Sequence, residues 1–155
     1  MVKTVEQRLK DMGILLPEPA APAANYIPFI TTGKMIFVSG QITILNGELQ
    51  YQGKVGDTLS AEDGYQAARI CAINLIAQVK KACFGNLELV TQVVKLGGFV
   101  NCTSEFTDQP KVINGASDLI AEAFGEIGKH TRFAVGASSL PLDVAVEVDG
   151  IFEIA

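Results

Sequence analysis

The chain has 155 residues, of which 48% are hydrophobic and 19% charged, and its formal net charge is −5. This length and composition predict one ordered globular domain, 1–155, that can bury a core without disulfides. The acidic balance argues against nucleic acid as a partner. The three cysteines form no CxxC pair, which argues against a disulfide framework and against a zinc site.

The first 24 residues have the pattern of an N-terminal extension to a core domain that spans 25–155. Thr4 and Gln7 have the spacing of a capping box, and Gly13 is expected to end the short helix that follows. Three prolines, at positions 17, 19 and 22, then predict an extended connector. The segment lacks the apolar core of a signal peptide, and no later stretch has the ~20 apolar residues of a membrane span. We therefore expect a soluble, cytoplasmic protein.

Strand patterns begin at Tyr26. The sequence predicts strands over 26–31 and 35–39, and then a hairpin from 42 to 51. Asn46-Gly47 at the centre of this hairpin is the dipeptide typical of a type I′ turn.

Two long helices and a strand between them follow. Apolar residues at steps of three and four predict helices over 60–83 and from Pro110 to about Gly128. The strand covers 90–102, and Gly97-Gly98 within it indicates either a bulge or a close approach of another group. With no phosphate-binding motif, this order predicts an α+β fold in which both helices pack on one face of a mixed sheet.

The last two strands, 131–137 and 144–154, carry the residues of greatest interest. Alternation along the final strand puts Val146 and Val148 on the core face and Glu147 on the other face. If the two strands form an antiparallel hairpin, Arg132 projects from the same non-core face as Glu147, as a diagonal neighbour.

Two interpretations of these charges remain open. Arg132 can form an ordinary cross-strand ion pair with Glu147 or Asp149. Alternatively, its planar fork can bind a substrate carboxylate while Glu147 positions or deprotonates a water molecule. A sheet face that no helix covers is commonly closed by association of subunits, so such a site could be shared between copies.

Four segments resemble the RidA/YjgF family of reactive intermediate deaminases, which also carries the label endoribonuclease L-PSP. They are Val38-Ser39-Gly40-Gln41-Ile42, the helix segment 68–74 with Asn74, Val112-Ile113-Asn114, and the C-terminal run Arg132-Phe133-Ala134-Val135 with Leu140-Pro141 and Val146-Glu147-Val148. The C-terminal run is the most specific of the four. The resemblance extends from Tyr26 to about Ile154.

This resemblance implies a chorismate-mutase-like fold, a homotrimer with sites between subunits, and hydrolysis of 2-imino acids and enamines such as 2-aminoacrylate to 2-keto acids and ammonia. It implies no cofactor and no metal. Arg132 would anchor the substrate carboxylate and Glu147 would position water, and the pocket lining would comprise Tyr26, Ser39, Gly40, Asn114 and the backbone of Ala134. Ala134 stands where many family members have cysteine.

Two other functions are compatible with parts of the sequence. The first is a non-catalytic trimeric protein that binds small carboxylates, which the Ala134 departure and the N-terminal extension favour. The second is ribonuclease action, which the acidic charge and the single histidine, His130, oppose. We interpret His130 as a loop residue.

Overall fold

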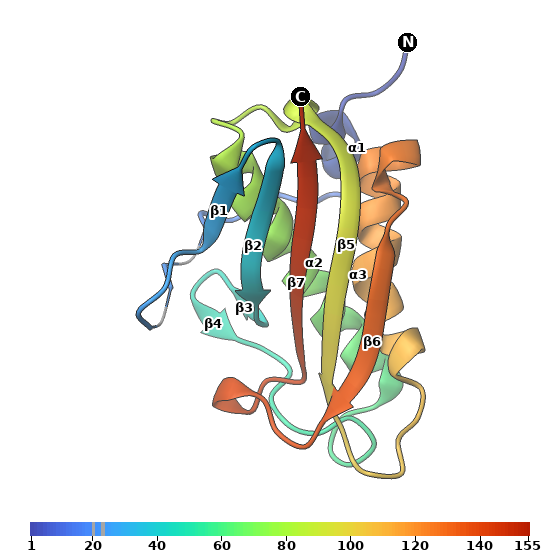
Figure 1. Ribbon diagram of the computed structural model, residues 1–155. Helices are drawn as coiled ribbons and strands as arrows, with labels where there is room; N and C mark the ends of the chain where they lie inside the picture. Colours follow the sequence, from blue (N-terminus) through green and yellow to red (C-terminus); the bar gives the residue numbers. More distant parts are fainter. Residues whose placement is uncertain (20, 23) are drawn as a thin grey trace.

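The structure is a computed structural model that describes residues 1–19, 21–22 and 24–155. Within these residues, five strands form one mixed sheet in the order β1-β2-β7-β5-β6, and helices α2 and α3 lie behind it in Figure 1. The sheet strands are β1 (Phe29–Thr32), β2 (Met35–Gln41), β5 (Val90–Asn101), β6 (Thr131–Ala137) and β7 (Val146–Ile154), and the helices are α1 (Val5–Asp11), α2 (Ala61–Ala82) and α3 (Gln109–Phe124). This arrangement confirms the predicted α+β fold.

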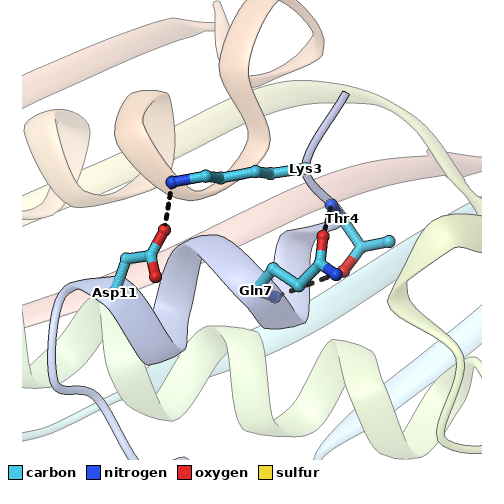
Figure 2. A network of polar contacts seen from close by, with 4 residues as sticks. All are labelled: Lys3, Thr4, Gln7 and Asp11. Atoms are coloured by element: carbon cyan, nitrogen blue, oxygen red, sulfur yellow. Dashed lines mark hydrogen bonds and ion pairs between the residues drawn. The ribbon is translucent and has the colours of Figure 1, made fainter. Parts of the chain in front are cut away.

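Helix α1 begins with the predicted capping box, which Figure 2 shows from close by. The Thr4 hydroxyl accepts a hydrogen bond from the Gln7 backbone N–H at 3.2 Å, and the Gln7 side chain accepts one from the Thr4 N–H at 2.9 Å. Val5 and Leu9 are buried in the hydrophobic core, so the N-terminal helix packs on the body of the protein. The predicted connector after this helix includes Ala20 and Ala23, which lie outside the described residues.

The predicted hairpin forms a separate two-stranded sheet of β3 (Ile44–Leu45) and β4 (Glu48–Leu49). Asn46 and Gly47 both have positive φ, at 53° and 81°, as the type I′ turn requires. The Asn74 side chain on α2 donates hydrogen bonds to the carbonyls of Ile42 and Ile44 at 3.0 and 2.7 Å. These bonds fix the hairpin beside the end of β2.

Helices α2 and α3 bury the apolar stripes that the sequence predicted. Ser60 caps α2 through a reciprocal pair of hydrogen bonds with Asp63. The two helices pack closely at Gly115, where an added Cβ would collide with the Tyr65 carbonyl oxygen. Short 3-10 helices at Leu87–Leu89, Gly125–Gly128 and Pro141–Asp143 join other elements.

The first predicted strand, 26–31, is wrong at its start. Strand β1 begins at Phe29, and Tyr26 precedes it in an irregular segment. Pro28 has no N–H to give to a sheet ladder, so pairing starts one residue later. The Pro28 carbonyl instead accepts a hydrogen bond from the Ser39 N–H at 2.9 Å.

The predicted pairing of the last two strands is also wrong. Strand β5 lies between β6 and β7, parallel to β6 and antiparallel to β7. Its Gly97 and Gly98 mark a close approach of side chains, because an added Cβ at Gly97 would meet Asp149 and Phe133 and one at Gly98 would meet Ile113.

Candidate functional site

Arg132 lies on β6, on the sheet face that the helices cover. It is level with buried Leu96 of β5, and its guanidinium reaches α3. Nη1 donates a hydrogen bond to the Ser117 hydroxyl at 3.1 Å, and Nη2 donates one to the Pro110 carbonyl at 3.2 Å. No carboxylate within the described part of the chain forms an ion pair with Arg132. Both acceptors that hold the arginine are therefore uncharged.

Asn114 and Ala134 belong to the same region. Asn114 lies between Pro110 and Ser117 on one side of α3, because the steps of four and three residues return to the same helix face. Ala134 follows Arg132 by two residues on β6, so it shares the helix-covered face, and its methyl group packs against the core. Arg132, Asn114 and Ala134 form what we term the arginine half-site.

Glu147 lies on the opposite sheet face, level with partly exposed Phe99 of β5. Figure 1 views the sheet from the side away from α2 and α3. Its side chain occupies the space above Gly40, where any Cβ would collide with the Glu147 carboxylate. The sheet register shifts between Val38 and Gln41, which forms a bulge that brings Gly40 against β7. Burial raises the pKa of Glu147, and the negative charge of Asp149 raises it further by a smaller amount.

Ser39 and Tyr26 lie near Gly40, the residue over which the Glu147 carboxylate sits. The Ser39 hydroxyl donates to the Ile27 carbonyl at 2.8 Å, which ties the irregular segment before β1 to the bulge. A pocket of about 380 Å³ includes Tyr26, Ser39 and Asp149 in its lining, and a smaller pocket adjoins Tyr26 and Gly40. Together with Glu147, the predicted residues Tyr26, Ser39 and Gly40 form what we term the glutamate half-site.

Asp149 is a member of the glutamate half-site that the sequence suggested only as an ion-pair partner of Arg132. It lies two residues after Glu147 on the same face, above Gly97. Burial raises the pKa of Asp149, while the Gly97 N–H and Lys95 act in the lowering direction. The pattern of alternation could have identified it, since a carboxylate two residues from a candidate base shares its sheet face.

The two half-sites of one chain are far apart. Arg132 is level with Gly150 of β7 across β5, so Glu147 lies two strands away and three residues further along. With strands ~4.8 Å apart and ~3.4 Å per residue, the backbones are roughly 14 Å apart, and the side chains leave opposite faces. The prediction that Arg132 and Glu147 project together from one face is therefore wrong, and both ion pairs considered for Arg132 are excluded within a chain.

Arg132 was predicted on the wrong sheet face because of how polar and apolar residues alternate along β6. Its apolar residues Phe133 and Val135 face the side that no described helix covers, where Phe133 packs edge-on against Phe99 with ring centroids 5.2 Å apart. The helix-covered side receives Arg132 and Ala134 instead. The assumption that apolar side chains mark the core face fails here because both faces of the sheet are apolar.

Neither a metal site nor a membrane segment is evident in the described residues. They contain no group of three or more His, Cys, Asp or Glu side chains placed to hold a metal ion. None of their helices combines the length and the apolar character that a membrane crossing demands.

Comparison with known proteins gives a consistent result. Residues 6–153 match the model of the family described as "YjgF/chorismate mutase-like, putative endoribonuclease". Protein TCP17 of Trypanosoma cruzi is 44% identical over 151 residues, which cover 97% of this chain and 94% of that protein. The solved structure of Atu1372 from Agrobacterium tumefaciens is 45% identical with a TM-score of 0.92, covering 97% of this chain and 92% of that one. A solved structure from Shewanella oneidensis MR-1 is 39% identical with a TM-score of 0.95, covering 98% and 100%.

Proposed function

This chain belongs to the RidA/YjgF family, and we propose that it hydrolyses reactive 2-imino acids and their enamine tautomers, such as 2-aminoacrylate. In this reaction water adds to C2 of the imine, and the resulting carbinolamine expels ammonia to leave a 2-keto acid. Arg132 anchors the substrate carboxylate, and Glu147 accepts a proton from the attacking water and returns it to the departing nitrogen.

The observation that carries this proposal is the state of Arg132. Two of its five N–H groups are hydrogen-bonded to described residues, and both acceptors are uncharged. Three N–H groups and the whole positive charge therefore remain for a ligand. A guanidinium fork in this state matches the two oxygens of a carboxylate.

Glu147 has properties suited to a general base. Its pKa is raised by burial and by Asp149, which moves its basicity toward neutral pH, where a general base is most effective. Gly40 provides the space that its carboxylate occupies. Asp149, two residues along the same sheet face, lines a pocket whose other walls are mainly apolar.

We further propose that each site forms between two chains of a homotrimer, with Arg132 from one copy and Glu147 from the next. The separation of the half-sites in one chain requires a second copy if both are to contact one small substrate. The open sheet face also carries apolar side chains suited to burial between copies. Ile30 is 54% exposed, Phe37 42%, Phe99 37% and Val135 44%.

An assay of imine decay tests the activity. Freshly generated 2-aminoacrylate or 2-iminobutanoate is mixed with the protein, and loss of the imine is followed. We expect Arg132→Ala to lower kcat/KM by about a thousandfold, because a charged partner of the carboxylate is removed. Lys129→Ala, which removes an exposed cation paired with Glu126, is the matched control and is expected to stay within about twofold. Wild-type decay no faster than that of Arg132→Ala would overturn the proposal.

Mixing of subunits tests the shared site. Co-expressed Arg132→Ala and Glu147→Gln chains should recover about a quarter of the wild-type activity, since each site needs the right variant on both sides. Either variant alone should remain inactive. No recovery in mixed assemblies would contradict a site formed between copies.

A second candidate function is carboxylate binding without turnover, and Ala134 favours it. The family's frequent cysteine is replaced there by a methyl group that packs on the core. Calorimetric titration with 2-oxobutanoate distinguishes the two functions. Binding that depends on Arg132, with imine decay no faster than in buffer, would support the binding protein.

We also propose a cytoplasmic location. Cys71, Cys83 and Cys102 are all buried and free of disulfides. Reduced thiols of this kind are typical of a reducing compartment.

A further inference from the structure

His130, the one histidine of the chain, precedes Arg132 by two residues. Its Nδ1 is 2.6 Å from the Gly128 carbonyl oxygen, and its Nε2 is 2.9 Å from the Ser117 hydroxyl. Ser117 is the same residue that accepts the hydrogen bond of Arg132. A continuous chain of hydrogen bonds thus joins the backbone at Gly128 to the guanidinium.

With a neutral imidazole, the chemistry of the groups sets the direction of each bond. A carbonyl oxygen only accepts, so Nδ1 of His130 carries the proton that points to Gly128. In the neutral ring Nε2 then has a lone pair, and it accepts the hydroxyl proton of Ser117. The Ser117 oxygen is left to accept from Arg132, which can only donate. Every member donates in one direction, from Arg132 through Ser117 and His130 to Gly128.

This series of hydrogen bonds orients the arginine without neutralising it. An aspartate or glutamate at the position of Ser117 would hold the guanidinium more firmly, but it would compete with a substrate carboxylate for the same charge. Ser117 and His130 orient the guanidinium and bring no negative charge. Fixing a long side chain in advance also removes the entropy cost of ordering it when the ligand binds.

We propose that Ser117 and His130 are positioning residues that hold the Arg132 guanidinium ready for the substrate carboxylate. They do so through the Nδ1–H tautomer of His130. This inference rests on the proposed function only in the identity of the ligand as a carboxylate. The hydrogen-bond chain itself belongs to the free protein.

The single histidine allows a spectroscopic test that needs no activity. In protein with ¹⁵N-labelled histidine, NMR of the ring nitrogens should show a protonated Nδ1 and an unprotonated Nε2. Adding 2-oxobutanoate should shift these signals in the wild type but not in Arg132→Ala. An Nε2–H tautomer, or ring signals that Ser117→Ala leaves unchanged, would overturn the proposal.

Kinetics with conservative variants provide the second test. Ser117→Ala and His130→Leu should each raise KM by about tenfold with kcat within about twofold, since the guanidinium binds ground state and transition state alike. Ser117→Thr keeps a hydroxyl and His130→Gln keeps an acceptor for it, so both should return KM to within about threefold of wild type.

The two proposals fail in different ways. If Ser117→Ala and His130→Leu have the KM of the wild type while Arg132→Ala is inactive, the positioning role is wrong and the deaminase stands. If the wild type turns over no imine, the deaminase is wrong, and the dissociation constant for 2-oxobutanoate replaces KM. A tenfold weaker dissociation constant in Ser117→Ala then supports the positioning role, and an unchanged one overturns it.

Discussion

The arginine half-site and the glutamate half-site differ in the charges that surround their main residue. Arg132 is surrounded by neutral acceptors and has no carboxylate partner among the described residues, so its charge is directed but not cancelled. Glu147 and Asp149 are two acids side by side, and burial shifts the pKa of both upward. The first arrangement suits binding of an anion, and the second suits exchange of a proton. On the proposed function, carboxylate binding and proton transfer would therefore fall to residues on separate faces of the sheet.

The largest effect is expected from Glu147→Gln. The amide keeps the shape of the side chain but cannot accept the proton of water, so kcat should fall by about a thousandfold. Asp149→Asn, on the same face, is the matched control and should retain most of the activity at alkaline pH. Steady-state imine decay measures both, and equal losses would show that Glu147 has no special role.

The next largest effect is expected from placing a negative charge beside Arg132. Ser117→Asp gives Arg132 a carboxylate partner that competes with substrate, so KM should rise by about a hundredfold. Ser117→Asn is of similar size and uncharged, and should raise KM by about fivefold at most. If the two variants have the same KM, the neutral surroundings of Arg132 are unimportant.

A smaller effect concerns the pH dependence of kcat. A base must be deprotonated to act, and the pKa of Glu147 is raised. The rising limb of the kcat–pH profile should therefore lie above the ordinary pKa of glutamate. Asp149→Asn removes the neighbouring negative charge that contributes to this shift. The limb should therefore move to lower pH in Asp149→Asn, and a limb that stays in place would contradict the coupling.

The smallest effect is on stability. A carboxyl whose pKa is raised by folding stabilises the protein fully below its unfolded pKa and loses that contribution as pH rises through the folded pKa. Asp149→Asn should thus match the wild type in acid and melt about 2 °C higher near neutral pH. Thermal denaturation followed by circular dichroism at both pH values gives the comparison. A lower melting temperature near neutral pH would contradict it.

Local patterns predicted those parts of the fold that local physics determines. Steps of three and four gave α2 and α3, the Asn46-Gly47 dipeptide gave the hairpin turn, and alternation gave the two faces of β7. Alternation along the last two strands singled out Arg132 and Glu147 as candidates, and the resemblance to the family supplied the imine chemistry, which alternation could not.

The pairing of β6 could not be read from local patterns. A short linker between β6 and β7 suggested a hairpin, but α3 carries the chain over from β5 to a parallel neighbour at the sheet edge. The sequence of the linker does not indicate that β5 lies between β6 and β7. The roles of Ser117 and His130 were missed for the same reason, since the contact to Arg132 exists only once α3 lies against β6.

The length of the short segment from Gly128 to Arg132 sets where its polar groups lie relative to α3 and to the sheet. Its carbonyl, imidazole and guanidinium are spaced so that the chain of hydrogen bonds closes on α3 while β6 enters the sheet. Side chains in a strand alternate between faces with each residue. Adding or deleting one residue in this segment would either break the hydrogen bonds from His130 or force β6 to slip by one residue, which would turn the guanidinium to the opposite face of the sheet. The length of this segment should therefore be as strictly constrained as the identity of the arginine.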